Sequence, residues 1–110
     1  MEVLQRNSRG AFTVPAHGLY PYQWLWDSAF IALGWTQVDW ERAGQELLCL
    51  FDYGQGPDGM LPHIVFHEQS RDYFPGPDVW GREARAQPAT SGITQPPVVA
   101  TVVRYLYEKD

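Results

Sequence analysis

The sequence contains a single cysteine, no cluster of basic residues and no long apolar run, and each of these absences excludes a class of protein. Cys49 has no second cysteine to pair with, so no disulfide framework can form, and we expect a reducing, cytoplasmic compartment. The eight Lys and Arg residues are scattered and the net charge is −5, which argues against a nucleic-acid surface. No apolar run approaches the roughly 18 to 20 residues of a membrane span, and residues 1–10 are too polar for a signal peptide. We therefore expect neither nucleic acid nor a membrane as a partner, and a small neutral ligand fits better.

The sequence also lacks a convincing site for a metal or a cofactor. His17, His63 and His67, together with one cysteine, do not have the spacing of metal ligands. The Gly-Gln-Gly run at residues 54–56 resembles a phosphate-binding loop only superficially, because no Lys and no helix follow it in the required places. We expect no metal and no cofactor.

What the sequence does contain is aromatic side chains, which make up 15% of the chain and include five Trp. Seven of them crowd one short stretch: Tyr20, Tyr22, Trp24, Trp26, Phe30, Trp35 and Trp40. Aromatic rings are large apolar anchors with oriented faces. Such crowding indicates either a heavily packed core or a platform on which a ring-shaped ligand stacks.

Apolar residues at three-to-four spacing predict helices over residues 24–35 and 40–53. Asp39 is placed to cap the start of the second helix, and Gly54 stands where a C-terminal glycine would. A third helix is expected from near Pro96, with Thr94 as its cap. Its valines also suit a strand, but the run continues to Glu108 without alternation, so we predict a helix.

A connection of about forty residues separates the second and third predicted helices, far more than an ordinary link of a few residues. It holds apolar islands, including residues 60–66 and 73–80, which favour a wall or lid over a site instead of a floppy insertion. The third helix also reaches Asp110 without a stop signal, and three helices offer each other little surface to bury. We expect a piece of a longer protein.

Asp27 is the only charged residue between Ala11 and Val38, and it directly follows Trp-Leu-Trp. A carboxylate in apolar surroundings is costly unless it is paired or hydrogen-bonded. It either caps the helix or pairs with an arginine, or it binds sugar hydroxyls between aromatic faces.

Trp24 and Trp26 are two residues apart and cannot share a helix face. We therefore expect one of them to line a site while the other packs in the core, unless both belong to the core. His63 could donate to a ligand hydroxyl or serve only the structure.

No nucleophilic Ser, His and Asp grouping stands out in the sequence. Glycoside hydrolysis needs two carboxyl groups, about 5 to 5.5 Å apart in retaining enzymes and about 6.5 to 9.5 Å apart in inverting ones. Asp58 and Asp78 occupy Pro-Asp turns that explain them locally. Other acids are also available, and none of the six is favoured as a catalytic residue: Asp52, Asp58, Glu68, Asp72, Asp78 and Glu83.

Four blocks, in order, carry a family resemblance: LYPYQWLWDSAFIALGW at residues 19–35, GMLPHIVF at 59–66, YFPGPDVWG at 73–81 and TSGITQPP at 90–97. They resemble the mannosylglycerate and glucosylglycerate hydrolases of the glycoside hydrolase family 63 type, and more distantly processing α-glucosidases and trehalases. The resemblance implies an all-α fold: a partial (α/α)6 toroid of about three helices, with the long loop between the second and third. Residues 1–110 would form the amino-terminal part of one incomplete barrel domain.

The same resemblance implies a substrate site. Tyr20 would belong to a mobile element that closes over the substrate, while Trp24, Trp26 and Asp27 would line the sugar subsite, with Asp27 binding hydroxyls. His63 and Gln95 match positions that face the same pocket. A general acid Asp and a general base Glu, acting by inversion, would come from later in the chain.

The resulting prediction is a fragment of a hydrolase that cleaves the α-glycosidic bond of a small glycoside such as mannosylglycerate or glucosylglycerate. We expect the fragment alone to bind weakly and to hydrolyse nothing, and a homo-oligomer of the full-length form is left open. The alternatives are a related α-glucosidase or trehalase-like enzyme, and a non-catalytic carbohydrate-binding helical module.

Overall fold

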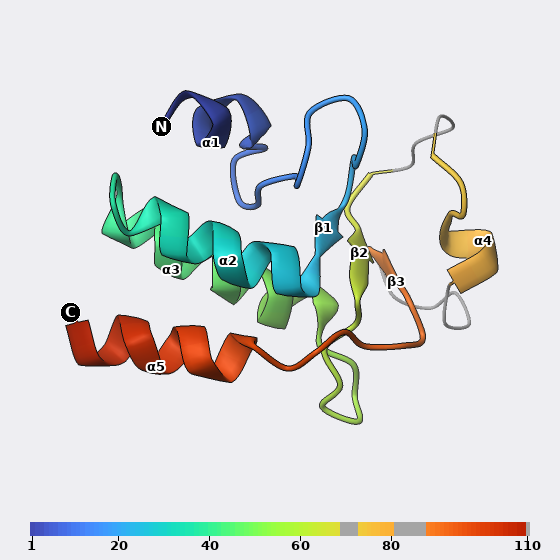
Figure 1. The fold of residues 1–110 in the computed structure, drawn as a ribbon. Coiled ribbons are helices and arrows are strands. Elements are labelled where there is room, and N and C mark those ends of the chain that lie inside the picture. Colours follow the sequence, from blue (N-terminus) through green and yellow to red (C-terminus); the bar gives the residue numbers. More distant parts are fainter. Residues whose placement is uncertain (69–72, 81–87, 110) are drawn as a thin grey trace.

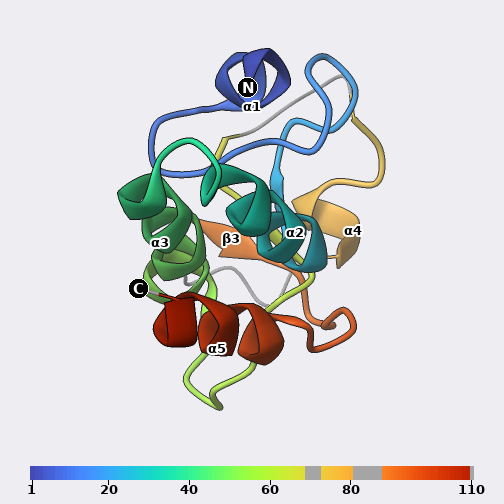
Figure 2. The same ribbon diagram turned by 60° about the vertical axis from the view of Figure 1, so that its left-hand side comes forward.

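The computed structural model describes residues 1–68, 73–80 and 88–109, which form a helical layer with a small sheet at one end. Helices α2, α3 and α5 lie side by side, the sheet stands at the amino-terminal ends of α2 and α5, and α4 lies outside β3 (Figure 1, Figure 2). The elements in chain order are α1 (Glu2–Asn7), β1 (Gln23–Trp24), α2 (Leu25–Trp35), α3 (Trp40–Cys49), the π-helical turn η1 (Leu50–Gly54), β2 (Ile64–Phe66), α4 (Pro77–Trp80), β3 (Ala89–Thr90) and α5 (Val99–Lys109).

Helices α2 and α3 confirm the first two helix predictions, except at the end of the second. In α2 the buried residues Leu25, Ala29 and Ala32 recur at three-to-four spacing on the face that packs against α3. Asp39 caps α3 as expected, because its Oδ1 accepts a hydrogen bond of 3.0 Å from the Arg42 backbone N–H. The α-helix ends at Cys49, however, and the chain continues as the π-helical turn η1.

Gly54 ends η1 for a different reason from the one that the sequence suggested. Its φ is not positive, so no left-handed cap requires glycine here. A Cβ at this position would instead lie 2.8 Å from Val65 Cγ2, closer than real carbon atoms approach. The glycine therefore lets β2 pack directly against the end of η1.

The third helix prediction is confirmed against its strand alternative, although the predicted start is wrong. Helix α5 begins at Val99, and its buried residues Val99 and Val102, spaced for a helix, join the core formed with α2, α3 and η1. Thr94 lies five residues before this start and donates to the Gln95 carbonyl, so it is not the cap.

The all-α prediction is confirmed only in part: helices dominate the structure, but the chain also contains a three-stranded antiparallel sheet in the order β1, β2, β3. Val65 of β2 lies opposite Gln23 on one side and Thr90 on the other. Strands of two or three residues are too short to show an alternating pattern, which explains why the sequence did not reveal them. The sheet ties residues 64–66 and 89–90 of the long connection to the entrance of α2, so these parts of the connection pack against the fold.

The aromatic crowding noted in the sequence divides between core and surface. Tyr22 and Trp24 are buried with Ile64 and Phe66 in a second cluster beside the sheet, whereas Tyr20, Trp26 and Phe30 remain exposed. The core interpretation therefore holds for Tyr22 and Trp24, and the platform interpretation of the exposed rings stays a prediction. Over residues 1–68, 73–80 and 88–109, the helices are too short or too polar to cross a bilayer.

Candidate ligand-binding site

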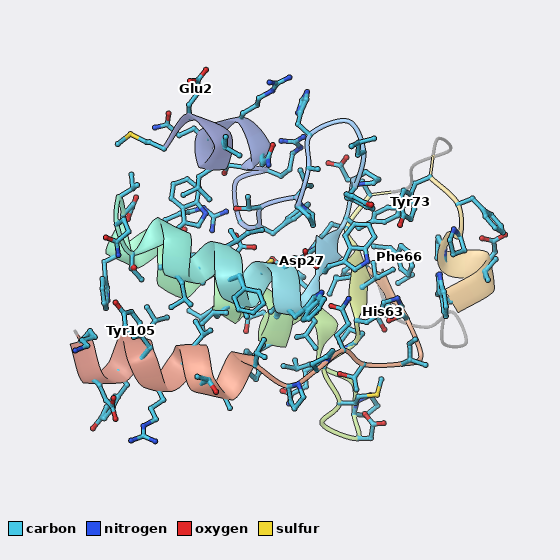
Figure 3. The ribbon with its side chains drawn as sticks, viewed as in Figure 1. Glu2, Asp27, His63, Phe66, Tyr73 and Tyr105 are labelled. Carbon is cyan, nitrogen blue, oxygen red and sulfur yellow. The ribbon has the colours of Figure 1, made fainter. Side chains whose placement is uncertain are left out.

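A hollow of about 290 Å³ opens at the start of α2, where β1 ends. Its lining residues come from three stretches of the chain and are Pro15, Tyr20, Trp24, Asp27 and Gln95. The fold thus brings together four of the residues singled out in the sequence: Tyr20, Trp24, Asp27 and Gln95. Figure 3 shows Asp27 at the β1 end of α2, with Tyr73, Phe66 and His63 on the side of the sheet.

The position of Trp24 and Asp27 follows from an abrupt change of backbone conformation. Trp24 ends β1 in an extended conformation, with φ −99° and ψ 142°, and α2 begins at the next residue. The first N–H groups of a helix have no partner within it. Here the Leu25 N–H donates to the His63 carbonyl at 3.0 Å, and the Trp26 N–H donates to Gln95 Oε1 at 3.1 Å. Gln95 therefore lines the hollow and also caps α2.

Asp27 is half-buried in the first turn of α2, where the helix dipole favours a negative charge. Burial raises the pKa of its carboxyl group above the ordinary value, and a hydrogen bond from its own backbone N–H partly opposes this rise. Within the described part of the chain, no Lys, Arg or His forms an ion pair with it. The arginine partner considered from the sequence is thus absent from these residues, and the carboxylate retains acceptor capacity for a ligand in the hollow.

Aromatic rings form one wall of the hollow. The Tyr20 ring meets the Trp24 ring edge-on, with centroids 5.5 Å apart and an interplanar angle of 83°. Tyr73 packs against both rings, at centroid distances of 5.9 Å from Tyr20 and 5.4 Å from Trp24. Tyr73 is a site residue that the sequence pattern did not predict, although its place in an aromatic island of the long connection was a usable signal. It orients the two rings that line the hollow.

Trp26 lies outside the hollow on the exposed side of α2. Its ring pairs with that of Phe30, one turn further along the helix, at a centroid distance of 6.2 Å. With 42% of its surface exposed, it belongs to neither the hollow nor the core.

His63 is buried beside the site and hydrogen-bonded within the fold. Its Nδ1 lies 2.6 Å from Ser91 Oγ, and its ring meets the Trp80 ring edge-on with centroids 5.1 Å apart. Burial lowers the pKa of the imidazole, which favours the neutral ring. These contacts support its structural interpretation, and a role towards a ligand stays a prediction.

The side chains around the hollow suit a ligand without charge. A half-buried carboxylate and an amide supply oriented hydrogen bonds, while Tyr20 and Trp24 supply apolar ring surface. In the parts of the chain that the structure describes, no three His, Cys, Asp or Glu side chains gather as a metal site would require. The arrangement is typical of proteins that bind polyhydroxylated molecules such as sugars.

Comparison with known families identifies the class more closely. The mannosylglycerate hydrolase MGH1-like glycoside hydrolase domain matches residues 20–110, which include every residue of the hollow except Pro15. The chain therefore belongs to this glycoside hydrolase family.

Individual relatives agree with the family. The chain is 98% identical over 110 residues to a mannosylglycerate hydrolase from Thermus thermophilus, covering 100% of this chain and 26% of that protein. It is 44% identical over 111 residues to a glucosylglycerate hydrolase from Mycolicibacterium hassiacum, covering 96% of this chain and 25% of that protein. The chain spans about a quarter of the length of these relatives.

A solved structure shows the same fold for this portion. The crystal structure of the family 63 mannosylglycerate hydrolase from a second strain of Thermus thermophilus, in complex with Tris and D-glycerate, superposes with a TM-score of 0.92. The two chains are 94% identical, and the match covers 99% of this chain and 25% of that chain. The short strands, absent from the prediction, thus belong to a region that closely matches an experimental structure.

Proposed function

We propose that this chain is the amino-terminal part of an inverting glycoside hydrolase that cleaves the α-glycosidic bond of mannosylglycerate or glucosylglycerate. The observation that carries the proposal is the hollow in which Asp27, lacking an ion-pair partner among the described residues, lies beside Tyr20 and Trp24. The names of the relatives favour this branch over an α-glucosidase, a trehalase-like enzyme or a non-catalytic module.

In the proposed site the chain contributes binding groups for the sugar ring. Asp27 accepts hydrogen bonds from sugar hydroxyls, Trp24 and Tyr20 offer ring surface, and the Gln95 side chain borders the same space. Burial of the ring excludes water and so strengthens these hydrogen bonds. Trp26 and His63 are included in this subsite on the family resemblance alone.

The catalytic pair would come from a later part of the longer enzyme. An inverting mechanism uses a general acid Asp and a general base Glu on opposite sides of the bond, about 6.5 to 9.5 Å apart, with a water between the base and the sugar. The relatives are about four times as long as this chain, which leaves ample sequence for that pair.

An incomplete (α/α)6 toroid accounts for an otherwise exposed apolar surface. A groove of about 770 Å³ runs beside α5, and the apolar residues that line it include Leu25, Phe51, Leu61, Val99 and Val103. Contiguous apolar surface of this kind is normally covered. In the proposed barrel, further helices of the same polypeptide would pack into this groove.

The test is Asp27→Asn in the full-length enzyme, with the exposed Asp52→Asn as the matched control. Asparagine keeps the shape of the side chain but loses the charge that strengthens its hydrogen bonds, so we expect kcat/KM for mannosylglycerate to fall by about 100-fold or more. Wild-type kinetics in Asp27→Asn would remove this residue from the site. Faster cleavage of trehalose or a glucose disaccharide than of either glycerate glycoside would support the α-glucosidase alternative, and sugar binding without hydrolysis would support a binding module.

A further inference from the structure

A buried polar network lies directly behind the candidate site, on the side of α2 that faces α3. Its centre is the Glu46 carboxylate, which is fully buried. This carboxylate accepts hydrogen bonds from the Thr13 backbone N–H at 3.1 Å, from the Thr13 hydroxyl at 2.7 Å and from the Ser28 hydroxyl at 2.6 Å. Arg42, one turn earlier on α3, supplies the opposite charge at 3.0 Å. A buried carboxylate is tolerated only when it is satisfied in this way.

The network holds both ends of the segment that carries Trp24 and Asp27. Ser28 directly follows Asp27, and its hydroxyl donates to Glu46. Gln23 directly precedes Trp24, and its side-chain amide donates to Ser28 Oγ and to the Glu46 backbone carbonyl, each at 3.1 Å. Both ends of the four-residue segment that contributes two lining residues to the hollow are thus tied to one position on α3.

These ties fix the rotation of α2 about its own axis. Side-chain atoms lie about 5 to 6 Å from a helix axis, so a rotation of about 10° moves such an atom by about 1 Å. A displacement of about 1 Å at a substrate-positioning group can lower a rate by about 100-fold. Because Ser28 is adjacent to Asp27, the hydrogen bond from Ser28 to Glu46 limits the displacement that such a rotation would cause at Asp27.

We propose that Glu46 is a positioning residue that acts through Ser28 and Gln23 to hold Asp27 and Trp24 in place for sugar binding. The proposal rests on the proposed function of the hollow. A purely structural role would lower the stability of the enzyme and leave the KM of the folded molecules unchanged. A positioning role raises KM in molecules that are fully folded.

The experiment uses the full-length enzyme and compares Ser28→Ala, Glu46→Gln and their combination, with the exposed Glu41→Gln on the same helix as the control. KM and kcat for mannosylglycerate are measured well below the melting temperature of each variant. We expect Ser28→Ala to raise KM several-fold, Glu46→Gln to raise it about ten-fold or more, and Glu41→Gln to leave it unchanged. The combined variant should raise KM by less than the product of the two single effects, because Glu46→Gln removes the charge that strengthens the same hydrogen bond that Ser28→Ala deletes.

Two results would overturn the proposal. One is a wild-type KM in folded Ser28→Ala, a variant that removes a single oxygen and remains informative if Glu46→Gln does not fold. The other is a combined effect equal to the product of the single ones, which would show that Ser28 does not act through Glu46. Asp27→Asn separates this inference from the proposed function: if it weakens binding while Ser28→Ala does not, the sugar site stands and the positioning role fails.

Discussion

Replacing Gly54 by alanine should destabilise the protein, although alanine normally stabilises where the backbone of the replaced glycine is not left-handed, as here. The added Cβ would lie 2.8 Å from Val65 Cγ2 and 3.4 Å from Pro62 Cδ and Cγ. Carbon atoms pack best at about 3.5 to 4.0 Å, so the contact with Val65 is too short by about 1 Å. Val65 is fully buried and its strand is paired on both sides, which prevents β2 from moving away easily.

The net effect is the difference between two terms. Overpacking a core costs about 1 to 3 kcal/mol, and the rigid position of Val65 favours the upper half of this range. Alanine reduces the entropy of the unfolded chain and recovers about 0.4 to 1 kcal/mol, because the backbone of Gly54 is not in a left-handed conformation. We expect Gly54→Ala to lower the free energy of unfolding by about 1 to 2.6 kcal/mol.

A double-mutant cycle with Val65→Ala tests the cause. Val65→Ala removes the clashing methyl group and should cost about 1.5 to 3 kcal/mol alone, from lost burial and a small cavity. In the combined variant the methyl group added at position 54 occupies part of that cavity. The double variant should therefore lose about 1 to 2 kcal/mol less stability than the sum of the losses in the two single variants. The assay is urea denaturation of the intact protein, with Gly44→Ala, where a Cβ meets nothing within 4 Å, as the control. Strictly additive costs, or a Gly54→Ala protein as stable as the wild type, would refute the reasoning.

Three further predictions concern the cap of α2, a buried imidazole and the groove beside α5. Gln95→Ala should cost about 0.5 to 2 kcal/mol and speed hydrogen exchange of the Trp26 amide, because this amide loses its acceptor, whereas Gln95→Glu should retain protection. Burial lowers the pKa of His67 to about 4 from an ordinary 6.5, so its neutral form stabilises the fold above pH 6.5, and this contribution is lost as the pH falls towards 4. The melting temperature of His67→Gln should therefore depend less on pH in this window. Val103→Asp, placed in the groove, should lower the melting temperature of the full-length enzyme more than Thr101→Asp, an exposed position on the same helix outside that groove.

Sequence patterns revealed the helices because their signals are local. Asp39 precedes the apolar period of α3 by one residue, and the structure shows the capping bond that this order predicts. The sheet was missed because its strands are defined by partners far along the chain, such as Val65 with Gln23 and Thr90. The end of α3 was misjudged for a similar reason, since the need for glycine at position 54 arises from contact with β2.

The candidate site was predictable to the extent that its residues are contiguous. Trp24 and Asp27 belong to one run, and a single charge among indole rings is visible without any knowledge of the fold. Glu46 was visible by the same logic but was overlooked: it lies three residues after Ala43 and four before Leu50, on the face that the helical period assigns to the core. A charged residue on such a face predicts a specific partner, although the period alone does not identify it.

The contacts that anchor residues 23–28 to other parts of the chain join residues 18 to 69 positions apart, and this separation explains how one short segment can serve as a binding surface. Glu46 reaches Ser28 across 18 positions, and Gln95 reaches the Trp26 amide across 69. A two-residue strand and the first turn of a helix have few internal hydrogen bonds of their own, so their geometry is set by these distant partners. Substitutions at Glu46 should therefore affect the binding that we propose for the hollow, although Glu46 does not line the hollow itself. The geometry of residues 23–28 is therefore set more by distant partners such as Glu46 and Gln95 than by hydrogen bonds within the segment.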